Sequence, residues 1–548
     1  MKTVHGNTVG LKPRQRRDLE HLYKRRIDQN AVVVPLVANR MIALSLETDR
    51  QVGILVDRTG RITHVIVGDA SRVWIPDLGR ERAGHSRLRG LRLVHTHPGG
   101  ELLDLDDILD LTRLRLDLVA ALMPDATRTN PHVNAIYPVY APGTPDPYEK
   151  LGPTPLSAFN LDFQDMVAAL EEELRRARTD LPAGKDGRAI LVGASTSRSS
   201  LGVAGLEELD SLSRSAGVSV SCRIHQRRSR LDPNTIVGKG KLLEIITRSI
   251  TDDADVLIFD HDLTPKQARA ISAFTDMRVI DRTQLILDIF AQRARTNDGQ
   301  LQVELAQLKY MMPRLVERDD ALSRLTGGIG GRGPGETKLE IGRRRVRERV
   351  ARLEDRIDKL ARQRRQRRKR RQLSGVPLAA LVGYTNAGKS TLLNTLTGSD
   401  VPAENRLFAT LDSTTRRLRL ASGRTLVLAD TVGFIRRLPA TLMSAFRVTL
   451  EEISDAAVII HLLDASNPEA DMHLAAVEGI LGDMGLGSIP RIVGVNKTDR
   501  ADPDVLDRLV ALTGGVALSS RTREGAAPLL ERLDDVLGRL VFTSPPVS

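Results

Sequence analysis

A short glycine-rich segment has the residue types and spacing of a phosphate-binding loop. It reads GYTNAGKS, runs from Gly383 to Ser390 and is followed by Thr391. An apolar stretch of strand length precedes it, and leucines at helical spacing follow it. Glycines let the backbone turn so that its N–H groups face anionic oxygens, and the start of a helix adds its dipole. We expect Lys389 to reach the β- and γ-phosphates of a nucleotide and the Ser390 hydroxyl to bind Mg²⁺. The candidate binding residues of this loop are Gly383, Tyr384, Thr385, Asn386, Ala387, Gly388, Lys389 and Ser390.

Three later segments supply what a guanine nucleotide needs. Asp430-Thr431-Val432-Gly433 follows an apolar strand, so the Asp can hold Mg²⁺ through water and the Gly amide can meet the γ-phosphate. Asn496-Lys497-Thr498-Asp499 follows another strand, and its final carboxylate can accept from N1–H and the 2-amino group of guanine. Adenine lacks that donor pair. Ser519-Ser520-Arg521 can offer a backbone N–H to guanine O6. A glycine-rich turn that ends in Lys-Ser by chance would not be followed by these segments, so we predict a GTP-binding domain.

The region before Asp430 contains the candidates for switch I. The segment Phe408-Ala409-Thr410-Leu411-Asp412 is followed by Thr414 and Thr415. A GTPase needs a threonine whose hydroxyl completes the Mg²⁺ shell and whose amide meets the γ-phosphate. All three threonines are chemically able, and spacing alone does not choose among them.

Phe434 follows Gly433, where many GTPases place a glutamine that orients the attacking water. Phenylalanine cannot donate to or accept from that water. We therefore expect slow intrinsic hydrolysis, with the water positioned by another residue or by a partner. A packed switch aromatic is the simpler interpretation of Phe434, and the two are compatible.

The composition limits the partners and the compartment. A chain of 548 residues exceeds what one core usually supports, so we expect about two to four domains. The net charge of +12 favours nucleic acid over an anionic membrane, and 3% aromatic residues argue against a stacking platform for single strands. The single cysteine, Cys222, excludes intrachain disulfides and indicates a reducing compartment. No run of residues approaches a membrane span, and we expect a soluble cytoplasmic protein.

The first 185 residues are predicted to form an α+β extension. They open with basic residues, and segments 51–57 and 62–67 alternate as a β-hairpin would. Another strand, 91–94, runs into a histidine-containing turn. A helix rich in aspartate is expected next, with Leu111, Leu114 and Leu118 as its apolar face.

That turn, His95-Thr96-His97-Pro98, resembles the zinc motif of JAMM metallopeptidases and RadC-like proteins. Two imidazoles and a carboxylate would hold Zn²⁺ and leave a position for water. Leu105 stands where that motif has serine, Asp107 is one residue short of the usual spacing, and Glu47 is the only candidate for the upstream glutamate. A degenerate fold relative without metal is the alternative, with these residues serving as turn and cap. A zinc-dependent hydrolase controlled by the GTPase stays a hypothesis.

Residues 186–281 alternate between strand and helix patterns, which predicts a small parallel α/β domain. Gly238-Lys239-Gly240-Lys241 lacks the spacing of a second phosphate loop and is interpreted as a basic turn before a helix. The strands are expected at 189–192, 218–224 and 256–259, and the helices at 206–214, 241–250 and 265–274.

Residues 282–373 are predicted to form an antiparallel helical hairpin. Apolar residues recur at steps of three and four in 301–322 and 339–360, and Pro313 is expected to kink the first helix. The tip, 326–336, reads TGGIGGRGPGE, and its Ile, Arg and Pro favour close approach to RNA over a flexible linker. The end of the second helix, RQRRQRRKRR at 362–371, has no acidic residue, so we expect salt-sensitive phosphate binding.

The segments GYTNAGKST, FATLD, DTVGF and NKTD, preceded by TGGIGGRGPGETKLE, resemble the HflX family of ribosome-associated GTPases over roughly residues 188–540. The N-terminal region is similar to the extension of some longer members. Gly342 departs from the aspartate that is commoner there, which weakens the helix by about 1 kcal/mol relative to Ala.

The resemblance implies a GTPase domain at 374–548, with Mg²⁺ as cofactor, Thr410 as its switch I ligand, and Lys389 and Thr410 as catalytic residues. It also implies a monomer that binds the large ribosomal subunit, with the tip reaching towards the peptidyl-transferase region. The GTP state would split stalled ribosomes, and hydrolysis would release the protein. A GTP-switched RNA-binding scaffold is the alternative.

Overall fold

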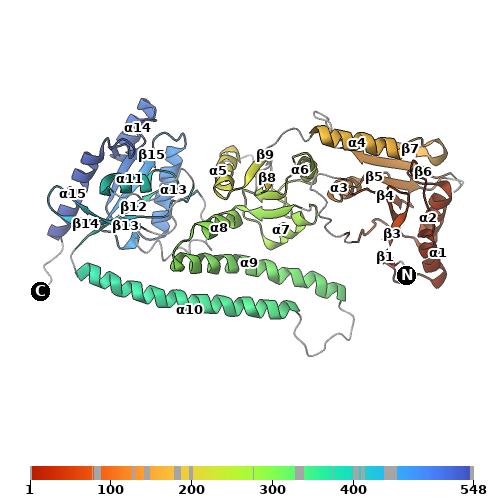
Figure 1. Cartoon of the computed structure of the whole chain (residues 1–548), viewed down its shortest axis with the longest axis horizontal. Coiled ribbons are helices and arrows are strands. Elements are labelled where there is room, and N and C mark those ends of the chain that lie inside the picture. Colours follow the sequence, from red (N-terminus) through yellow and green to blue (C-terminus); the bar gives the residue numbers. More distant parts are fainter. Residues whose placement is uncertain are drawn as a thin grey trace. The chain divides into compact units, whose positions relative to one another are not determined.

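The computed structural model divides the chain into two compact units (Figure 1). The first comprises residues 1–206, 218–260 and 266–280, and the second comprises 207–217, 261–265 and 281–548. The structure describes residues 3–76, 78, 88–125, 130–140, 148–177, 187–196, 202–252, 254–275, 277–326, 338–373, 376–398, 407–408, 414–436 and 453–543, without the side chains of 202–204, 315–326, 338–342, 364–365, 367–373 and 541–543. None of the described helices is long and apolar enough to cross a membrane.

The first unit contains a seven-stranded sheet in the order β1-β3-β2-β4-β5-β6-β7. The predicted hairpin is confirmed, because β2 and β3 pair antiparallel. β4 pairs antiparallel with β2 and parallel with β5. The strands are β1 (Val4–Gly6), β2 (Val52–Asp57), β3 (Ile62–Val67), β4 (Leu91–Thr96), β5 (Leu118–Met123), β6 (His132–Pro138) and β7 (Tyr148–Pro155).

Helices cover both faces of this sheet, since alternate residues of each strand point to opposite sides. One face packs with α1 (Pro13–Leu22), α2 (Pro35–Thr48) and α4 (Phe163–Ala177). The other face packs with α3 (Leu105–Arg113). The expectation that Leu118 belongs to the apolar face of this acidic helix is wrong. The helix ends at Arg113, Arg115 adopts a φ of 51°, and Leu118 begins β5.

A second sheet of the first unit has four strands in the order β11-β10-β8-β9. β8 pairs parallel with both β9 and β10, as a small parallel α/β domain requires. Gly238 is the N-cap of α6, and Lys239, Gly240 and Lys241 form the first turn of that helix, so the expectation of a basic turn before the helix is wrong for these three residues. The elements of this region are β8 (Arg188–Thr196), α5 (Gly202–Ser215), β9 (Ser219–Arg228), α6 (Lys239–Thr251), β10 (Val256–Phe259), α7 (Pro265–Ser272) and β11 (Arg278–Asp281). Most of α5, from residue 207 on, belongs to the second unit.

The two sheets of the first unit are joined through α3 and α6. Leu243 and Ile246 of α6 belong to the same apolar cluster as Ile108 and Leu111 of α3. Ile250, one turn further along α6, joins the cluster on the other face of the large sheet. Side chains of α6 at 243, 246 and 250 are thus buried against the N-terminal region.

The second unit contains the helical hairpin. α8 (Arg282–Arg293) leads to α9 (Asn297–Thr326), and α10 (Lys338–Leu373) returns along it (Figure 1). Leu301, Leu305 and Leu353 are buried between the two long helices, which confirms their predicted apolar seams. α9 continues through Pro313. The glycine-rich residues 327–336 lie outside the described part of the chain.

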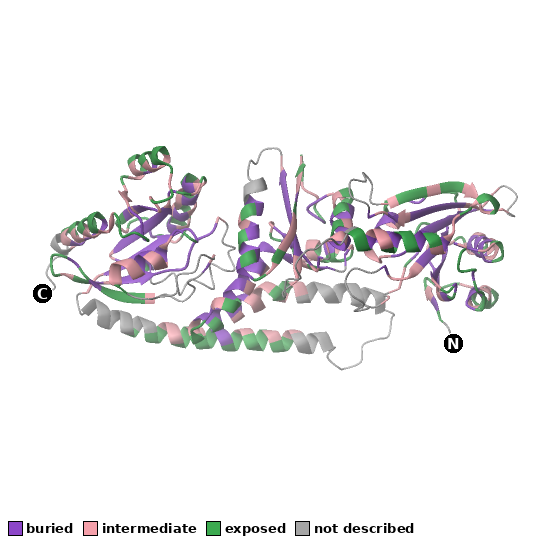
Figure 2. Ribbon diagram, turned by 45° about the horizontal axis from the view of Figure 1, so that its top comes forward, coloured by how far each residue is buried: buried purple, intermediate pink, exposed green. Residues whose placement is uncertain are grey.

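The GTPase domain is built on a six-stranded sheet in the order β13-β14-β12-β15-β16-β17. All neighbours pair parallel except β13 with β14. The four central strands, β14, β12, β15 and β16, are buried along most of their length, whereas β13 at the edge is mostly exposed (Figure 2). The elements are β12 (Leu378–Gly383), α11 (Lys389–Thr397), β13 (Thr414–Arg419), β14 (Thr425–Asp430), β15 (Val458–Asp464), α13 (Ala470–Asp483), β16 (Arg491–Asn496), α14 (Pro503–Thr513), β17 (Val516–Ala517) and α15 (Ala526–Thr543). The loops at the carboxyl ends of β12, β14 and β16 carry the predicted motifs, where parallel α/β sheets bind ligands.

Candidate functional site

The phosphate loop connects β12 to α11 in a conformation that two positions reserve for glycine. Gly383 and Gly388 adopt φ values of 155° and 98°. A Cβ atom at Gly383 would lie 2.4 Å from the carbonyl oxygen of Leu462, and one at Gly388 would lie 2.4 Å from Nδ2 of Asn496. Both steric limits keep the loop close against β15 and β16.

Lys389 is the first residue of α11, and its ammonium group is held over the loop. Nζ donates to the carbonyl oxygens of Gly383, at 3.1 Å, and Tyr384, at 3.0 Å. Burial lowers the pKa of Lys389 to about 8, while the charge of Asp430 acts in the opposite direction. A buried cation at a helix N-terminus is suited to bind an anion such as a polyphosphate.

The two predicted Mg²⁺ partners meet at the same end of the sheet. The Ser390 hydroxyl donates to Oδ2 of Asp430, at 2.6 Å, and Asp430 is fully buried at the end of β14. A hydroxyl and a carboxylate are the hard oxygen donors that Mg²⁺ prefers, so these residues fit the ion.

The structure describes only the two ends of the segment predicted to be switch I, at Phe408 and from Thr414 on. Ala409, Thr410, Leu411 and Asp412 lie outside the described residues. Thr414 and Thr415 belong to β13, where they pair with Asp430 and Ala429. Phe408 is buried, and the centroid of its ring lies 4.6 Å from that of Phe290 in α8. Its side chain therefore packs against α8 and does not line the nucleotide pocket.

The residues predicted to bind the guanine base line a pocket of about 280 Å³. Asp499 lies in its wall, with Oδ1 accepting from the Ser519 hydroxyl at 2.8 Å and Oδ2 accepting from Arg521 at 2.7 Å. These interactions, led by the Ser519 hydrogen bond, hold the pKa of Asp499 below its usual value. The carboxylate is therefore ionised and acceptor-only, as guanine recognition needs. The pocket is lined by Asn386, Gly388, Thr391, Asn496, Lys497, Asp499, Arg500, Ser520 and Arg521.

Asn496 ties three of the motifs together. Its Nδ2 donates to the carbonyl of Ala387 in the phosphate loop, at 2.7 Å. Its Oδ1 accepts from both the backbone N and the hydroxyl of Ser520, each at 2.9 Å. Lys497 has a φ of 65° and pairs with Asp464 at the end of β15, at 2.6 Å. Asn496 therefore connects the phosphate loop, the end of β16 and the Ser519–Arg521 turn.

The residues after Asp430 are bound to the phosphate loop through their backbone. The amide of Thr385 donates to the carbonyl of Phe434 at 2.7 Å, and the amide of Phe434 donates to Gly383 at 3.1 Å. A Cβ atom at Gly433 would lie 2.8 Å from Cα of Thr385. Thr431 donates its hydroxyl to Leu381, at 2.6 Å, and the Val432 and Phe434 side chains are buried. The interpretation of Phe434 as a packed aromatic is confirmed.

The side chain of Tyr384 makes contacts that the sequence motifs did not predict. Its ring stacks on His473 of α13, with 3.6 Å between centroids, and its hydroxyl accepts from the backbone N of Arg436 at 2.8 Å. The same hydroxyl donates to Glu208 of α5, which pairs with Arg282 at 2.7 Å. Motif spacing predicts the path of the loop backbone, but it carries no information on where this side chain points. Glu208, Arg282 and His473 lie far from every motif in the sequence.

Three family profiles match consecutive parts of the chain. They are GTP-binding GTPase N-terminal at 204–291, GTP-binding GTPase Middle Region at 293–371 and 50S ribosome-binding GTPase at 378–497. The GTPase HflX of Lacrimispora saccharolytica is 45% identical over 350 residues, which cover 64% of this chain and 83% of that protein. The GTPase HflX of Escherichia coli is 44% identical over 339 residues, 61% of this chain and 79% of that protein.

Among solved structures, a GTP-binding protein from Sulfolobus solfataricus in complex with GDP matches 65% of this chain and 99% of its own length, at 23% identity and a TM-score of 0.36. The two HflX proteins are matched over most of their own length, 83% and 79%. This chain belongs to the HflX family of GTPases.

Proposed function

We propose that this GTPase binds the large ribosomal subunit and, in its GTP state, separates stalled or idle ribosomes into subunits. The observation that carries the proposal is the long helix α10, which presents arginines to solvent in the same compact unit as the nucleotide site. The matched profile is named for binding of the 50S ribosome, which supports the same partner. Such a protein would work in the cytoplasm, and we expect it to act as a monomer.

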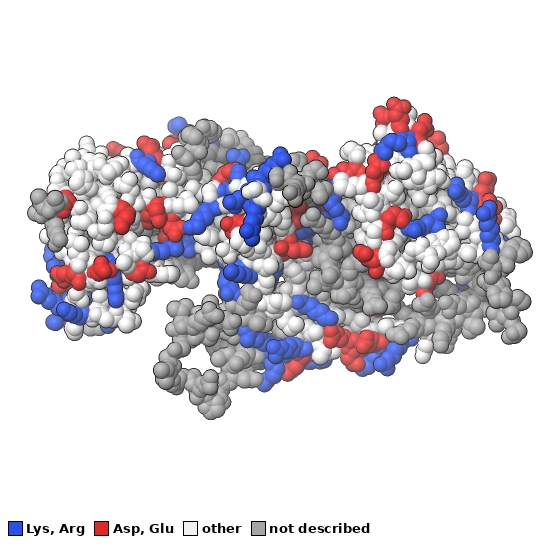
Figure 3. Space-filling model, turned by 180° about the vertical axis from the view of Figure 1, so that it is seen from behind, with Lys and Arg blue, Asp and Glu red and all other residues white. Residues whose placement is uncertain are grey.

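The charge along α10 changes from one end to the other. In its described first half, Arg349 pairs with Glu304 at 2.7 Å, and Glu354 pairs with Lys309 at 2.8 Å. Figure 3 accordingly shows basic and acidic side chains mixed on this part of the surface. Segment 362–371 holds eight Lys or Arg residues and no acid. We infer that ribosomal RNA phosphates contact this end of the helix, with Arg345, Arg347 and Arg356 as further exposed cations.

The nucleotide pocket would select guanine over adenine and bind the phosphates through charged side chains. Asp499 would accept the two guanine donors, and Lys389 would bind the β- and γ-phosphates. Ser390 and Asp430 would hold Mg²⁺, the Asp through water, with Thr410 as the proposed switch I ligand. When bound, the ion neutralises charge that develops on the phosphates.

The buried Phe434 side chain supports slow hydrolysis in the free protein, because nothing at that position can orient water. Contact with the ribosome would then accelerate hydrolysis by positioning the water. GTP would order the switch segments, and this would give the two nucleotide states different affinities for the ribosome, as a two-state binder requires.

Sucrose-gradient sedimentation tests the proposal. Ribosomes with this protein and a non-hydrolysable GTP analogue should shift towards free subunits, with the protein on the large subunit, whereas GDP should not produce the shift. Reversing three exposed charges together, Arg345→Glu, Arg347→Glu and Arg356→Glu, should weaken ribosome binding by about tenfold or more. Arg532→Glu, an exposed arginine on α15, is the matched control.

Two outcomes would contradict the proposal. One is intact ribosomes with unbound protein in the presence of the analogue. The other is GTP turnover that ribosomes do not accelerate, which would favour an RNA-binding scaffold that uses GTP only as a switch.

A further inference from the structure

A group of metal-ligand side chains lies in the first unit, at the carboxyl end of β4. His95 is in β4, His97 directly follows it, and Asp107 lies in the first turn of α3. One ligand atom from each lies within 4.8 Å of the others. His95 Nε2 is 3.4 Å from one Asp107 oxygen, and His97 Nε2 is 3.9 Å from the other. Ligand atoms around a tetrahedral Zn²⁺ are about 3.3 Å apart, so the spacing is close to what such an ion requires.

The ring of His97 is oriented for coordination through Nε2. Its Nδ1 lies 2.8 Å from the carbonyl oxygen of Glu101, which can only accept, so Nδ1 carries the proton. The lone pair is then on Nε2, which faces Asp107. Histidines that bind metals commonly donate their other N–H to a backbone carbonyl in this way.

His95 is buried, and within the described part of the chain neither of its ring nitrogens makes a hydrogen bond. Its ring meets that of His97 edge-on, with 4.7 Å between centroids. Buried polar atoms are normally satisfied, so an unsatisfied imidazole that faces a carboxylate and a second imidazole calls for an additional binding partner. A metal ion would satisfy it.

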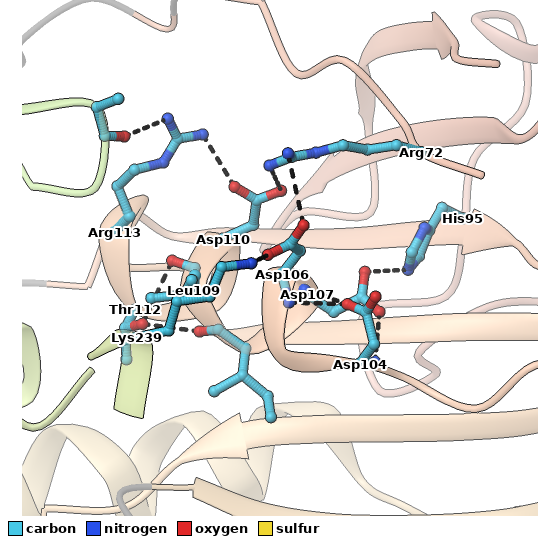
Figure 4. A network of polar contacts seen from close by, with 12 residues as sticks. Arg72, His95, Asp104, Asp106, Asp107, Leu109, Asp110, Thr112, Arg113 and Lys239 are labelled. Carbon is cyan, nitrogen blue, oxygen red and sulfur yellow. Dashed lines mark hydrogen bonds and ion pairs between the residues drawn. The ribbon is translucent and has the colours of Figure 1, made fainter. Parts of the chain in front are cut away.

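The cations around this group are engaged by other carboxylates (Figure 4). Lys239 pairs with Asp106 at 3.0 Å, and Arg113 pairs with Asp110 at 2.9 Å. Arg72 lies between those two acids, 3.6 Å from Asp106 and 3.9 Å from Asp110. The ion pairs described for Asp107 are with His95 and His97. Its negative charge therefore faces the imidazoles, where a dication would neutralise it.

The three side chains open onto a pocket of about 490 Å³, which leaves room for a water or another ligand as the fourth partner. Gln51, Arg72 and Glu101 also line it. Glu47, the only upstream candidate for a catalytic glutamate, is exposed on α2 and does not line the pocket. The expectation of a cap is met as well, because Asp107 Oδ2 accepts from the Asp104 backbone N at 2.8 Å.

We propose that His95, His97 and Asp107 bind one Zn²⁺ ion, with an open coordination position towards this pocket. Two imidazoles and one carboxylate favour Zn²⁺ over Mg²⁺ or Ca²⁺, which prefer ligand sets made of oxygen atoms. All three ligands belong to the first unit, whereas the phosphate loop belongs to the second.

Zinc content of the full-length, untagged protein tests the site. After removal of loosely bound metal, elemental mass spectrometry should find one zinc ion per protein chain. Replacement by Co²⁺ should give the visible absorption of a tetrahedral ion. His95→Ala, His97→Ala and Asp107→Asn should each lower the zinc content at least tenfold. Asn at 107 keeps an oxygen that can accept from the Asp104 amide, so this variant should fold.

Asp106→Asn is the matched control, because Asp106 is the neighbouring acid on the same helix and pairs with Lys239. It should keep its zinc. Unchanged GDP affinity shows that each variant retains its second unit. Zinc in the wild type no higher than in Asp107→Asn would overturn the proposal. Equal loss in Asp106→Asn, or one equivalent of iron in place of zinc, would overturn it too.

Discussion

We propose that the Asp499 carboxylate, which lines the pocket beside the phosphate loop, accepts from the two donors of guanine. Asp499→Asn replaces one acceptor oxygen with an amide that donates towards those donors. We expect the affinity for GTP to fall by about 10²-fold, since hydrogen bonds to a charged group contribute about 1.5–3 kcal/mol each. Xanthosine triphosphate, which carries an acceptor in place of the 2-amino group, should bind this variant better than GTP does. Titration with fluorescent nucleotides measures both.

Asp504→Asn, an exposed change in the first turn of α14, is the control and should leave both affinities within twofold. A variant that still prefers GTP would place the base elsewhere.

Lys389 gives the nucleotide site a dependence on pH. Burial lowers its pKa to about 8 in the free protein, and a bound polyphosphate would raise it by favouring the charged form. Below pH 8 the lysine is already protonated, and affinity should be flat. Above pH 8 binding must take up a proton, so affinity for GDP should fall by up to about tenfold per pH unit. Calorimetry in two buffers of different ionisation enthalpy would detect this proton uptake.

The affinity for GDP could instead be constant from pH 7 to 9.5, without proton uptake. That result would contradict a pKa of about 8 for Lys389 in the free protein.

At this scale the sequence motifs predicted which strand ends and turns come together. Asn496, Asp499 and Ser520 lie together as predicted, because strand ends and turn chemistry are local properties. The side chains of Tyr384 and Phe408 point out of the nucleotide pocket, towards α5, α13 and α8. Tertiary contacts determine those directions, and no local pattern encodes them.

Among the elements, Tyr384 links the phosphate loop to α5 and to the segment after Asp430. Tyr384→Phe removes the hydroxyl that joins Glu208 to the Arg436 amide, while keeping the stacking on His473. We expect a loss of about 1–2 kcal/mol in the free energy of unfolding of the second unit. We also expect a changed rate of GTP hydrolysis, since the Arg436 backbone loses an anchor. Chemical denaturation and single-turnover assays measure the two effects.

Tyr310→Phe is matched to it, because Tyr310 also donates its hydroxyl to a buried carboxylate, that of Asp281. This control should lose similar stability with unchanged hydrolysis. If the two variants have the same hydrolysis rate, Tyr384 is only a packing residue.

At the scale of elements, the sequence predicted the long helices and several buried strands and missed others. The seams of α9 and α10 and the strands β8 and β10 lie close to their expected positions. β5 was missed because its six residues, LVAALM, are all buried and show no alternation. A continuous apolar run fits a helix as well as a strand, and Leu118 was assigned to the preceding helix because it continues the three- and four-residue spacing of Leu111 and Leu114.

For the whole molecule, Trp74 provides a selective probe, since it is the single tryptophan and lies in the first unit. A nucleotide bound to the second unit stabilises that unit by about 2.7 kcal/mol at a hundred times its Kd. GDP should therefore raise the unfolding midpoint of the second unit, as followed by exchange of its amide hydrogens. The midpoint reported by Trp74 fluorescence should stay where it is.

Denaturation curves with and without GDP provide the measurement. Equal shifts in the two signals would mean that the units unfold as a single cooperative block.

The packing of α6 against α3 has a consequence for how this protein can be shortened. On α6, Leu243, Ile246 and Ile250 are shielded from water by the residues that precede β8. In a chain that began at residue 187, these three side chains would form an exposed hydrophobic patch, and the protein would tend to aggregate. We therefore expect a shortened form of this chain to need polar residues at positions 243, 246 and 250 to remain soluble.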